Sequence, residues 1–320
     1  MRQGGALMTE GRRLRLGVAL GGGSARGWAH MGVLQWLTER GLEPDVVCGT
    51  SIGALVGAAQ GAGQLPRLQE WVLSLSWQDV VSYLDVSFDG GLIRGRKLFD
   101  FFQRHFPAPP IEDLSCTYGA VATDLTSGQE IWLRQGPLLE AVRASVALPG
   151  LFTPVQYQGR WLVDGGLVNP VPVSVCRALG ADVVVAVDVN SDLLERREIK
   201  PASGEAAEPA PHEHPLDAQI GHAAGGWHRW LGGRARRLKR RLFEDTEEGP
   251  SLLDVMARSV HIMQVRITRS RMAGDPPEVL LSPRLGNIGL LEFHRGGEAL
   301  DAGRRCAEDA AETIERVLKR

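Results

Sequence analysis

One pentapeptide constrains this chain more than any other segment: Gly49-Thr50-Ser51-Ile52-Gly53. It lies between a short apolar stretch, residues 45–48, and a run of small apolar residues, 54–59, that is typical of a helix. A Gly-x-Ser-x-Gly sequence between a strand and a helix predicts a turn so tight that only glycine fits two residues on either side of the serine. The serine hydroxyl is then held out at the carboxyl end of the strand, where it is available as a nucleophile.

A second glycine-rich turn, Gly21-Gly22-Gly23-Ser24, ends the apolar stretch 14–20 and precedes a helical pattern over residues 26–40. Strand, turn and helix thus occur twice in succession, which predicts an α/β fold with a parallel sheet covered by helices. Flexible glycines at a helix N-terminus expose successive N–H groups, and the helix dipole favours negative charge there. We therefore expect Gly21, Gly22, Gly23 and Ser24 to form an oxyanion hole.

The same glycines raise the alternative of a phosphate-binding loop, but the spacing argues against it. A G-x-G-x-x-G pattern starting at Gly21 requires glycine where Arg26 stands, and one starting at Gly22 requires glycine where Ser24 stands. No G-x-x-x-x-G-K-[ST] occurs in the chain. A net charge of −2 gives no basic excess for neutralising phosphates, so we expect no nucleic-acid partner.

The remaining hydrophobic pattern predicts further helices and strands. Expected helices are residues 66–75, 95–106, 138–146, 251–271 and 292–320, and expected strands are residues 117–123, 129–133, 155–157, 160–163 and 182–187. The phenylalanines of 95–106 are typical of core packing, with the wall of an acyl pocket as the second interpretation. The four cysteines are widely scattered, and no run of 18 apolar residues or signal-peptide pattern occurs, so we expect a reducing, cytoplasmic location.

A serine hydroxyl needs an adjacent base to act as a nucleophile at neutral pH. His261 and His294 would follow the serine–acid–histidine order of α/β-hydrolases, but both belong to helix-like runs. Asp164-Gly165-Gly166 directly follows the predicted strand 160–163, and its two glycines let the backbone turn so that the carboxylate can point into a pocket. A plain Asp-Gly hairpin turn is the alternative for this tripeptide.

Four sequence blocks in this order resemble the bacterial branch of the patatin-like phospholipase family. They are Gly21-Gly22-Gly23-Ser24-Ala25-Arg26-Gly27, Gly49-Thr50-Ser51-Ile52-Gly53, residues 144–155, which begin Ala-Ser-Val-Ala-Leu-Pro-Gly, and residues 164–172, which begin Asp-Gly-Gly-Leu-Val-Asn-Pro. The resemblance spans about residues 14–190, with weaker similarity at 190–191 and 271–277.

The resemblance implies a three-layer α/β/α fold with a mostly parallel, doubly wound sheet. It also implies a lipid acyl hydrolase that cleaves phospholipid or lysophospholipid esters with a Ser–Asp dyad and needs no metal or cofactor. Ser51 would be the nucleophile, Asp164 the base, and amides around Gly22, Gly23 and Ser24 the oxyanion hole. Arg26 and Gly27 match the supporting residues of the first block, whereas Ser24 stands where the family usually has a third glycine. Because burial in an apolar pocket raises a carboxyl pKa, an aspartate can serve as the only base.

The composition changes after residue 190. We expect a loose tail over residues 1–13, a catalytic core over 14–190, a mobile insertion over 191–250, and a helical completion of the same domain over 251–320. Residues 227–243 carry seven Lys or Arg, no acidic residue, and several aromatics and leucines. This segment predicts either a helix that binds anionic membrane, which would make the protein membrane-peripheral, or a solvated basic segment.

Two further alternatives concern the same insertion. His212-Glu213-His214, with His222 and His228, raises the possibility of a metal site, but the spacing does not place two imidazoles on one helix face, so we expect no metal. A regulatory or adaptor protein that binds lipid or a protein partner through residues 191–250 is the alternative function. The intact Ser51 and Asp164 favour the enzyme.

Overall fold

The structure, a computed structural model, describes residues 8–9, 12–83, 96–106, 108–149, 151–194 and 252–319. The chain divides into two compact units, Met1–Arg196 together with Val260–Arg320, and Arg197–Ser259. All contacts discussed below lie within the first unit. The basic segment 227–243 and the histidine cluster 212–228 lie outside the described residues, so what the sequence predicts for them stays a prediction.

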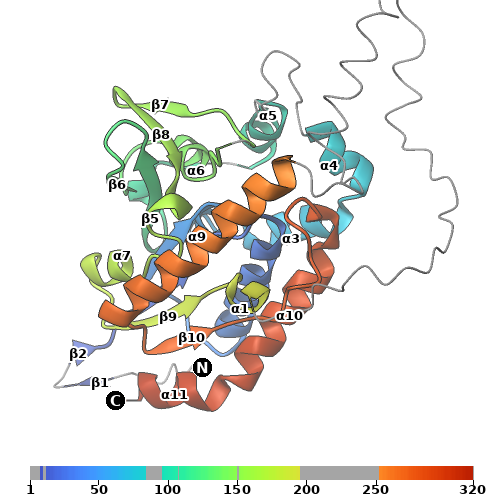
Figure 1. The fold of residues 1–320 in the computed structure, drawn as a ribbon. Helices are drawn as coiled ribbons and strands as arrows, with labels where there is room; N and C mark the ends of the chain where they lie inside the picture. Colours follow the sequence, from blue (N-terminus) through green and yellow to red (C-terminus); the bar gives the residue numbers. More distant parts are fainter. Residues whose placement is uncertain are drawn as a thin grey trace, which may run out of the picture. The chain divides into compact units, whose positions relative to one another are not determined.

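An eight-stranded sheet forms the centre of the first unit (Figure 1). The strand order is β10-β9-β3-β4-β5-β8-β7, and β6 also pairs with β5. Strands β10, β9, β3, β4 and β5 are parallel, whereas β6 and β8 are antiparallel to β5, and β7 is antiparallel to β8. The bounds are β3 Leu16–Leu20, β4 Val46–Thr50, β5 Thr117–Asp124, β6 Glu130–Leu133, β7 Val155–Tyr157, β8 Arg160–Asp164, β9 Val183–Val187 and β10 Val279–Leu281.

The central strands β3, β4 and β9 are buried along their whole length, and successive side chains point to opposite faces. In β9, for example, Val183, Val185 and Val187 join one hydrophobic core, while Val184 and Ala186 join another. A continuous apolar run is therefore needed to fill both layers. This explains why these strands read as unbroken hydrophobic stretches in the sequence.

Helices cover both faces of the sheet, which confirms the predicted three-layer α/β/α fold (Figure 1). Helices α1, α10 and α11 contribute to the first core, and α7 contributes to the second, against which α9 also packs. The helix bounds are α1 Ala29–Glu39, α2 Ile52–Gly61, α3 Leu65–Ser74, α4 Trp77–Tyr83, α5 Arg96–His105, α6 Leu138–Ser145, α7 Val173–Ala178, α9 Leu252–Gly274, α10 Gly296–Asp309 and α11 Ala311–Leu318. None of the described helices combines the length and hydrophobicity needed to cross a lipid bilayer.

The register of the sheet brings several chain turns to one edge. Leu20 in β3 pairs with Gly49 in β4 and with Val187 in β9, so these three parallel strands end at the same level. The turns that follow them, at residues 21–24, 51 and 188–190, therefore lie together at the carboxyl edge of the sheet, where open α/β sheets place their sites.

Strand β8 reaches the same place from the opposite direction. Strands β4 and β8 share one side of β5, because β6 occupies the other side. Thr50 pairs with Val121, and Asp164 pairs with the next residue, Ala122. The carboxyl ends of β4 and β8 therefore meet, although more than a hundred residues separate them in the chain.

The structure differs from the sequence-based elements in several places. The N-terminal segment expected to be a loose tail contains two short antiparallel strands, β1 Met8–Thr9 and β2 Arg12–Arg13. The helix expected from residue 26 starts as a 3₁₀ turn, η1 Ser24–Trp28, before α1. The single helix expected over 292–320 is divided into a 3₁₀ turn, η5 Phe293–Arg295, and helices α10 and α11. No glycine or proline lies between α10 and α11. The change of direction between these helices lets buried Ile314 and Leu318 reach the first core.

Candidate active site

Ser51 sits in the tight turn that its flanking glycines predict. Its backbone has φ +56° and ψ −125°, a conformation that side-chain-bearing residues rarely adopt and that is typical of strained functional turns. A Cβ atom on Gly49 would lie 2.4 Å from the Ala54 nitrogen, and one on Gly53 would lie 2.2 Å from the Leu20 carbonyl oxygen. Both glycines are therefore required by close backbone approach.

Asp164 meets this serine at the junction of β4 and β8. The Ser51 hydroxyl donates a hydrogen bond to Asp164 Oδ2 at 2.5 Å, and the Gly166 amide donates to Asp164 Oδ1 at 2.7 Å. The glycines that follow are packed closely, since a Cβ on Gly165 would lie 2.2 Å from the Val121 carbonyl oxygen. Rather than ending in an exposed hairpin turn, β8 thus presents a carboxylate directly to the serine.

Burial sets the protonation of this carboxyl. The side chain of Asp164 is 1% exposed, and desolvation raises its pKa from 3.8 to about 6, although the hydrogen bonds from Ser51 and Gly166 act in the opposite direction. The sequence analysis expects such an increase from burial in an apolar pocket, and the structure buries the carboxyl group almost completely. At neutral pH the carboxylate is ionised, and it is a better proton acceptor than an exposed aspartate.

The third sequence block holds these two residues in place. The Ser145 hydroxyl accepts a hydrogen bond from the Ser51 amide at 2.9 Å and donates one to the Val121 carbonyl at 2.6 Å. The Ala147 carbonyl accepts from the Asp164 amide at 3.0 Å. The sequence block contains Ser145, but only the fold shows that its hydroxyl orients the serine turn.

The glycine loop offers fewer free amides than the sequence predicts. Gly21 N–H donates to the Val187 carbonyl and Gly22 N–H to the Pro170 carbonyl. Because these two amides complete the packing of the loop, the prediction that they bind an oxyanion is wrong for this conformation. Within the described part of the chain, the amides of Gly23 and Ser24 make no hydrogen bond.

Two further features of the loop concern its shape. Gly22 faces the serine, since a Cβ built on it would lie 3.4 Å from Ser51 Cβ. Ser24, which stands where the resembling family usually has glycine, adopts φ +50°. It therefore takes the left-handed conformation at a cost of about 1–2 kcal/mol, which a glycine would avoid.

Arg26 and Gly27 lie behind the loop rather than in front of it. Arg26 is 2% exposed, and its guanidinium contacts the Gly23 carbonyl at 3.4 Å and the ring of His261 at 2.8 Å. Burial lowers its pKa to about 10, so it remains charged at neutral pH, with Asp192 and Asp188 partly compensating. A Cβ on Gly27 would lie 2.0 Å from an Ile52 methyl group, so this glycine lets η1 pack against the helix after Ser51.

Neither histidine considered as a base hydrogen-bonds to Ser51 in the described part of the structure. His261 contacts Arg26 and Asn190, and His294 packs edge-on against Trp77 with ring centroids 5.5 Å apart. Burial and the neighbouring Arg26 lower the pKa of His261 to about 3. An imidazole with so low a pKa is a poor proton acceptor, so the serine–acid–histidine alternative loses its support.

An apolar pocket opens beside Ser51. Its empty volume is about 800 Å³, part of which is open to solvent, and no described side chain that lines it is charged. Trp71 lies at the centre of an aromatic cluster along this pocket and contacts Trp28, Tyr83, Phe101, Phe102 and Phe106. Phe99 and Phe102 both line the pocket and belong to the buried cores, so this phenylalanine-rich helix packs in the core and also lines an apolar pocket.

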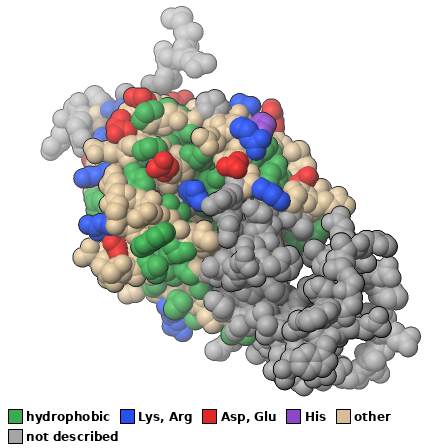
Figure 2. Space-filling model, turned by 90° about the horizontal axis from the view of Figure 1, so that it is seen from above, with side chains coloured by type: hydrophobic (Ala, Val, Ile, Leu, Met, Phe, Trp, Pro, Cys, Tyr) green, Lys and Arg blue, Asp and Glu red, His purple; other side chains and the backbone are tan. Residues whose placement is uncertain are grey.

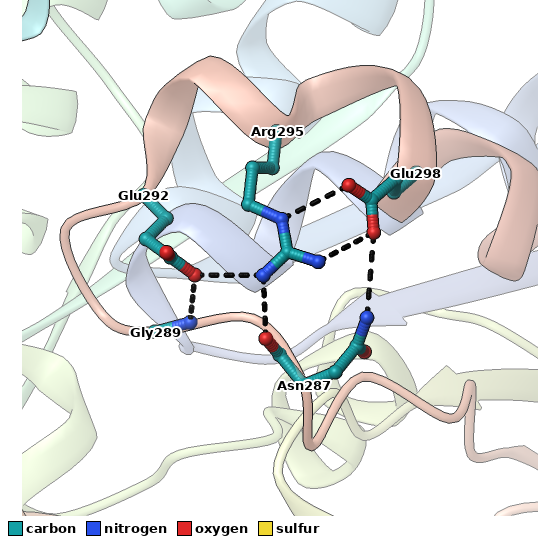
Figure 3. A network of polar contacts seen from close by, with 5 residues as sticks. All are labelled: Asn287, Gly289, Glu292, Arg295 and Glu298. Carbon is teal, nitrogen blue, oxygen red and sulfur yellow. Dashed lines mark hydrogen bonds and ion pairs between the residues drawn. The ribbon is translucent and has the colours of Figure 1, made fainter. Parts of the chain in front are cut away.

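The C-terminal part of the chain supplies one wall of the pocket. Phe293 lines it and accepts, through its carbonyl, a hydrogen bond from Trp28 Nε1 at 3.2 Å. The segment around Phe293 is held by Arg295, which pairs with Glu292 and Glu298 and donates to the Asn287 carbonyl (Figure 3). The Asn287 side chain adds one exposed hydrogen bond at the edge of this network, to Glu298 at 3.3 Å.

Among the described residues, no group of three or more His, Cys, Asp or Glu side chains is placed to hold a metal ion. The histidines of residues 212–228 lie outside this part of the structure. The site as described is built from a serine, a carboxylate, backbone amides without partners and an apolar pocket.

The chain is similar in sequence to proteins of one known family. The family model for patatin-like phospholipases matches residues 18–177. The NTE family protein Rv1063c of Mycobacterium tuberculosis is 32% identical, over 94% of this chain and 92% of its own length. Patatin-like phospholipase domain-containing protein 6 of Mus musculus is 35% identical over 55% of this chain, which corresponds to 14% of that protein.

Among solved structures, VipD from Legionella pneumophila aligns with 95% of this chain and 71% of its own at 12% identity and a TM-score of 0.44, a similarity too low to support an argument. The family model and the full-length relative are sufficient by themselves. Both agree with the resemblance of the four sequence blocks, which the structure gathers at one edge of the sheet. The chain belongs to the patatin-like phospholipase family.

Proposed function

We propose that this protein hydrolyses acyl esters of lipids, with Ser51 as nucleophile and Asp164 as its only general base. Membership of the patatin-like phospholipase family indicates a lipid acyl hydrolase. The observation that best supports a serine–aspartate mechanism is the 2.5 Å hydrogen bond from the Ser51 hydroxyl to a buried carboxylate, beside a pocket whose described lining carries no charge.

The reaction proceeds in two steps. Ser51 Oγ attacks the ester carbonyl carbon while its proton passes to Asp164 Oδ2, and the tetrahedral intermediate collapses as the leaving alcohol takes that proton. This leaves an acyl group on Ser51. A water molecule then gives a proton to Asp164 and attacks the acyl-enzyme, and the proton returns to Ser51 as the free acid leaves.

The negative charge on the carbonyl oxygen needs donors that are already in place. The free amides of Gly23 and Ser24 supply two, and they belong to the loop that packs against Ser51. The Ile52 amide, directly after the serine, also has no partner within the described residues and is a third candidate. Of the four residues that the sequence predicts for the oxyanion hole, the proposed set keeps Gly23 and Ser24 and omits Gly21 and Gly22.

The pocket supports a long acyl chain as the group that is transferred. A hydrocarbon chain in an uncharged aromatic and aliphatic pocket gains about 0.8 kcal/mol for each buried CH₂. Large hydrophobic side chains are also exposed, among them Trp77, Trp161 and Leu125, and hydrophobic patches are visible on the face drawn in Figure 2. Such surface suits an enzyme that takes its substrate from lipid aggregates.

The test combines active-site labelling with substrate hydrolysis. A fluorophosphonate probe should label the wild type. It should label Asp164→Asn much more slowly than wild type or not at all, and it should not label Ser51→Ala. Hydrolysis of lysophospholipids, diacyl phospholipids and p-nitrophenyl esters should be lost in both variants, while Ser127→Ala, in an exposed turn, should behave as wild type. Full turnover by purified Ser51→Ala would refute the nucleophile. An unlabelled, inactive wild type would instead favour the adaptor function.

A further inference from the structure

The three carbonyl groups of the glycine loop are each held by a different buried side chain. His30 Nε2 contacts the Gly21 carbonyl at 2.7 Å, Asn190 Nδ2 donates to the Gly22 carbonyl at 2.7 Å, and Arg26 Nε donates to the Gly23 carbonyl at 3.4 Å. These side chains come from α1, from the turn after β9, and from η1. Three elements therefore converge on a loop that has almost no side chains of its own.

Holding a carbonyl also fixes the amide of the same peptide group. In a planar trans peptide the C=O of one residue and the N–H of the next point in opposite directions. Asn190 therefore directs the Gly23 N–H away from itself, and Arg26 does the same for the Ser24 N–H. These are the two loop amides without partners, and the loop faces Ser51 through Gly22.

We propose that Asn190, seated by His261, is a positioning residue that aims the Gly23 amide at the developing oxyanion. This inference rests on the proposed serine hydrolase function and deepens it. Glycine peptides rotate more easily than others because they lack a Cβ, so an unanchored Gly22–Gly23 peptide would populate orientations that do not serve catalysis. Asn190 limits this freedom before substrate binds.

The orientation of the Asn190 amide is itself decided by its neighbours. Its backbone N–H donates to Asp188 Oδ1 at 2.9 Å, and the residue is 3% exposed. Its Oδ1 lies 3.0 Å from His261 Nε2, and Arg26 Nη2 lies 2.8 Å from the same ring nitrogen and 3.3 Å from Nδ1. Only the tautomer with a proton on Nε2 can donate to Asn190 Oδ1, and in it Nδ1 is the acceptor for Arg26, so the shorter approach of Arg26 to Nε2 is not a hydrogen bond. With Oδ1 accepting from His261, the Asn190 NH₂ group faces the Gly22 carbonyl, to which it donates at 2.7 Å.

The groups around the imidazole keep it in this neutral state. Arg26 is the charged group that it contacts directly, and the charges of Asp192 and Asp188 partly compensate the burial of that guanidinium. Helix α9, which supplies His261, is therefore connected to the oxyanion loop through Asn190 and Arg26. The sequence blocks include Arg26 and the weaker similarity includes Asn190, but only the fold shows that both side chains hold carbonyl groups of the loop.

The experiment measures kcat and KM for a p-nitrophenyl ester with the full-length chain. Asn190→Ala should lower kcat about 10- to 100-fold with KM changed less than twofold, because the interaction matters most in the transition state. The midpoint of its pH–rate profile should stay at the wild-type value, since Asp164 is untouched. Asn190→Asp should be at least as impaired, because a carboxylate oxygen would face the Gly22 carbonyl. Gln129→Ala, which removes an exposed amide side chain outside the site, is the matched control and should behave as wild type.

A second pair of variants keeps the test decisive if Asn190→Ala does not fold. His261→Gln can still donate to Asn190 and accept from Arg26, so it should keep kcat within about fivefold, whereas His261→Leu should lose it as Asn190→Ala does. Wild-type kcat in Asn190→Ala, or equal kcat in the two His261 variants, would overturn the inference. If Ser51→Ala were also active, the proposed function itself would fail, so the two failures are distinguishable.

Discussion

Replacing Asp164 with asparagine should make the folded protein more stable while abolishing its activity. The wild type keeps a carboxylate in a site that is 1% exposed, where the ionised form is disfavoured. Asparagine has nearly the same shape, can still accept from the Gly166 amide with its carbonyl oxygen, and carries no charge. The cost of burying an ionised group is therefore removed without opening a cavity.

The size of the effect follows from the pKa. Burial raises the Asp164 pKa from 3.8 to about 6, a difference of about 2 pH units, and each unit corresponds to 1.36 kcal/mol. Because the folded-state pKa is above the unfolded value, the folded state binds the proton more tightly, and the wild type loses stability as pH rises from about 4 to about 6. Above pH 7 the loss is complete, and it amounts to about 3 kcal/mol.

Urea denaturation of the two proteins at pH 8, 6 and 4 measures this difference directly. Asp164→Asn should exceed the wild type by about 3 kcal/mol at pH 8, by less at pH 6, and by under about 1 kcal/mol at pH 4, where the native wild-type carboxyl is protonated. Taking the difference between variant and wild type at each pH removes the contribution of the other titrating groups.

Ser51→Ala is the matched control, because it is equally inactive but keeps the buried carboxylate. It removes a hydrogen bond that lowers the Asp164 pKa, so its stability at pH 8 should fall by about 1 kcal/mol. An Asp164→Asn protein no more stable than wild type at pH 8, or stabilised equally at pH 4 and pH 8, would refute the reasoning.

Three further predictions concern the same site. The value of kcat/KM should rise tenfold per pH unit below about 6 and level off above it, because Asp164 must be deprotonated to act as base; a midpoint near 4 would contradict its burial. Ser24→Gly should raise the free energy of unfolding, measured in urea, by about 0.5–1 kcal/mol. Removing the strain of the left-handed conformation stabilises the folded state by more than the greater entropy of glycine stabilises the unfolded chain, whereas Ser24→Ala should give no gain. Ser145→Ala should lower the free energy of unfolding by about 2–4 kcal/mol and slow fluorophosphonate labelling, because it leaves two buried backbone groups without a hydrogen-bond partner. The control Ser115→Ala removes one hydrogen bond to a carbonyl and should lower the free energy of unfolding by less than about 1.5 kcal/mol. Equal losses in the two variants would contradict the role of Ser145.

Much of the secondary structure could be predicted because local patterns suffice for it. The central strands are unbroken apolar runs, and the turns after them are marked by glycines. The elements that were missed, β1, β2, α4, α7 and β10, are all short, and local periodicity does not mark them. The same holds for the division between α10 and α11, where no breaking residue occurs.

The sequence by itself determined the chemistry that is available: a serine in a turn that only glycine permits, an aspartate followed by two glycines, and the family to which these blocks belong. Only the tertiary structure decided how these groups are used. Sheet register brings the ends of β4 and β8 together and buries Asp164, and hydrogen bonds to Val187 and Pro170 remove two of the four expected oxyanion donors. Burial and the direction of a peptide group depend on residues distant in the chain, such as Asn190 and His261, and no local pattern encodes them.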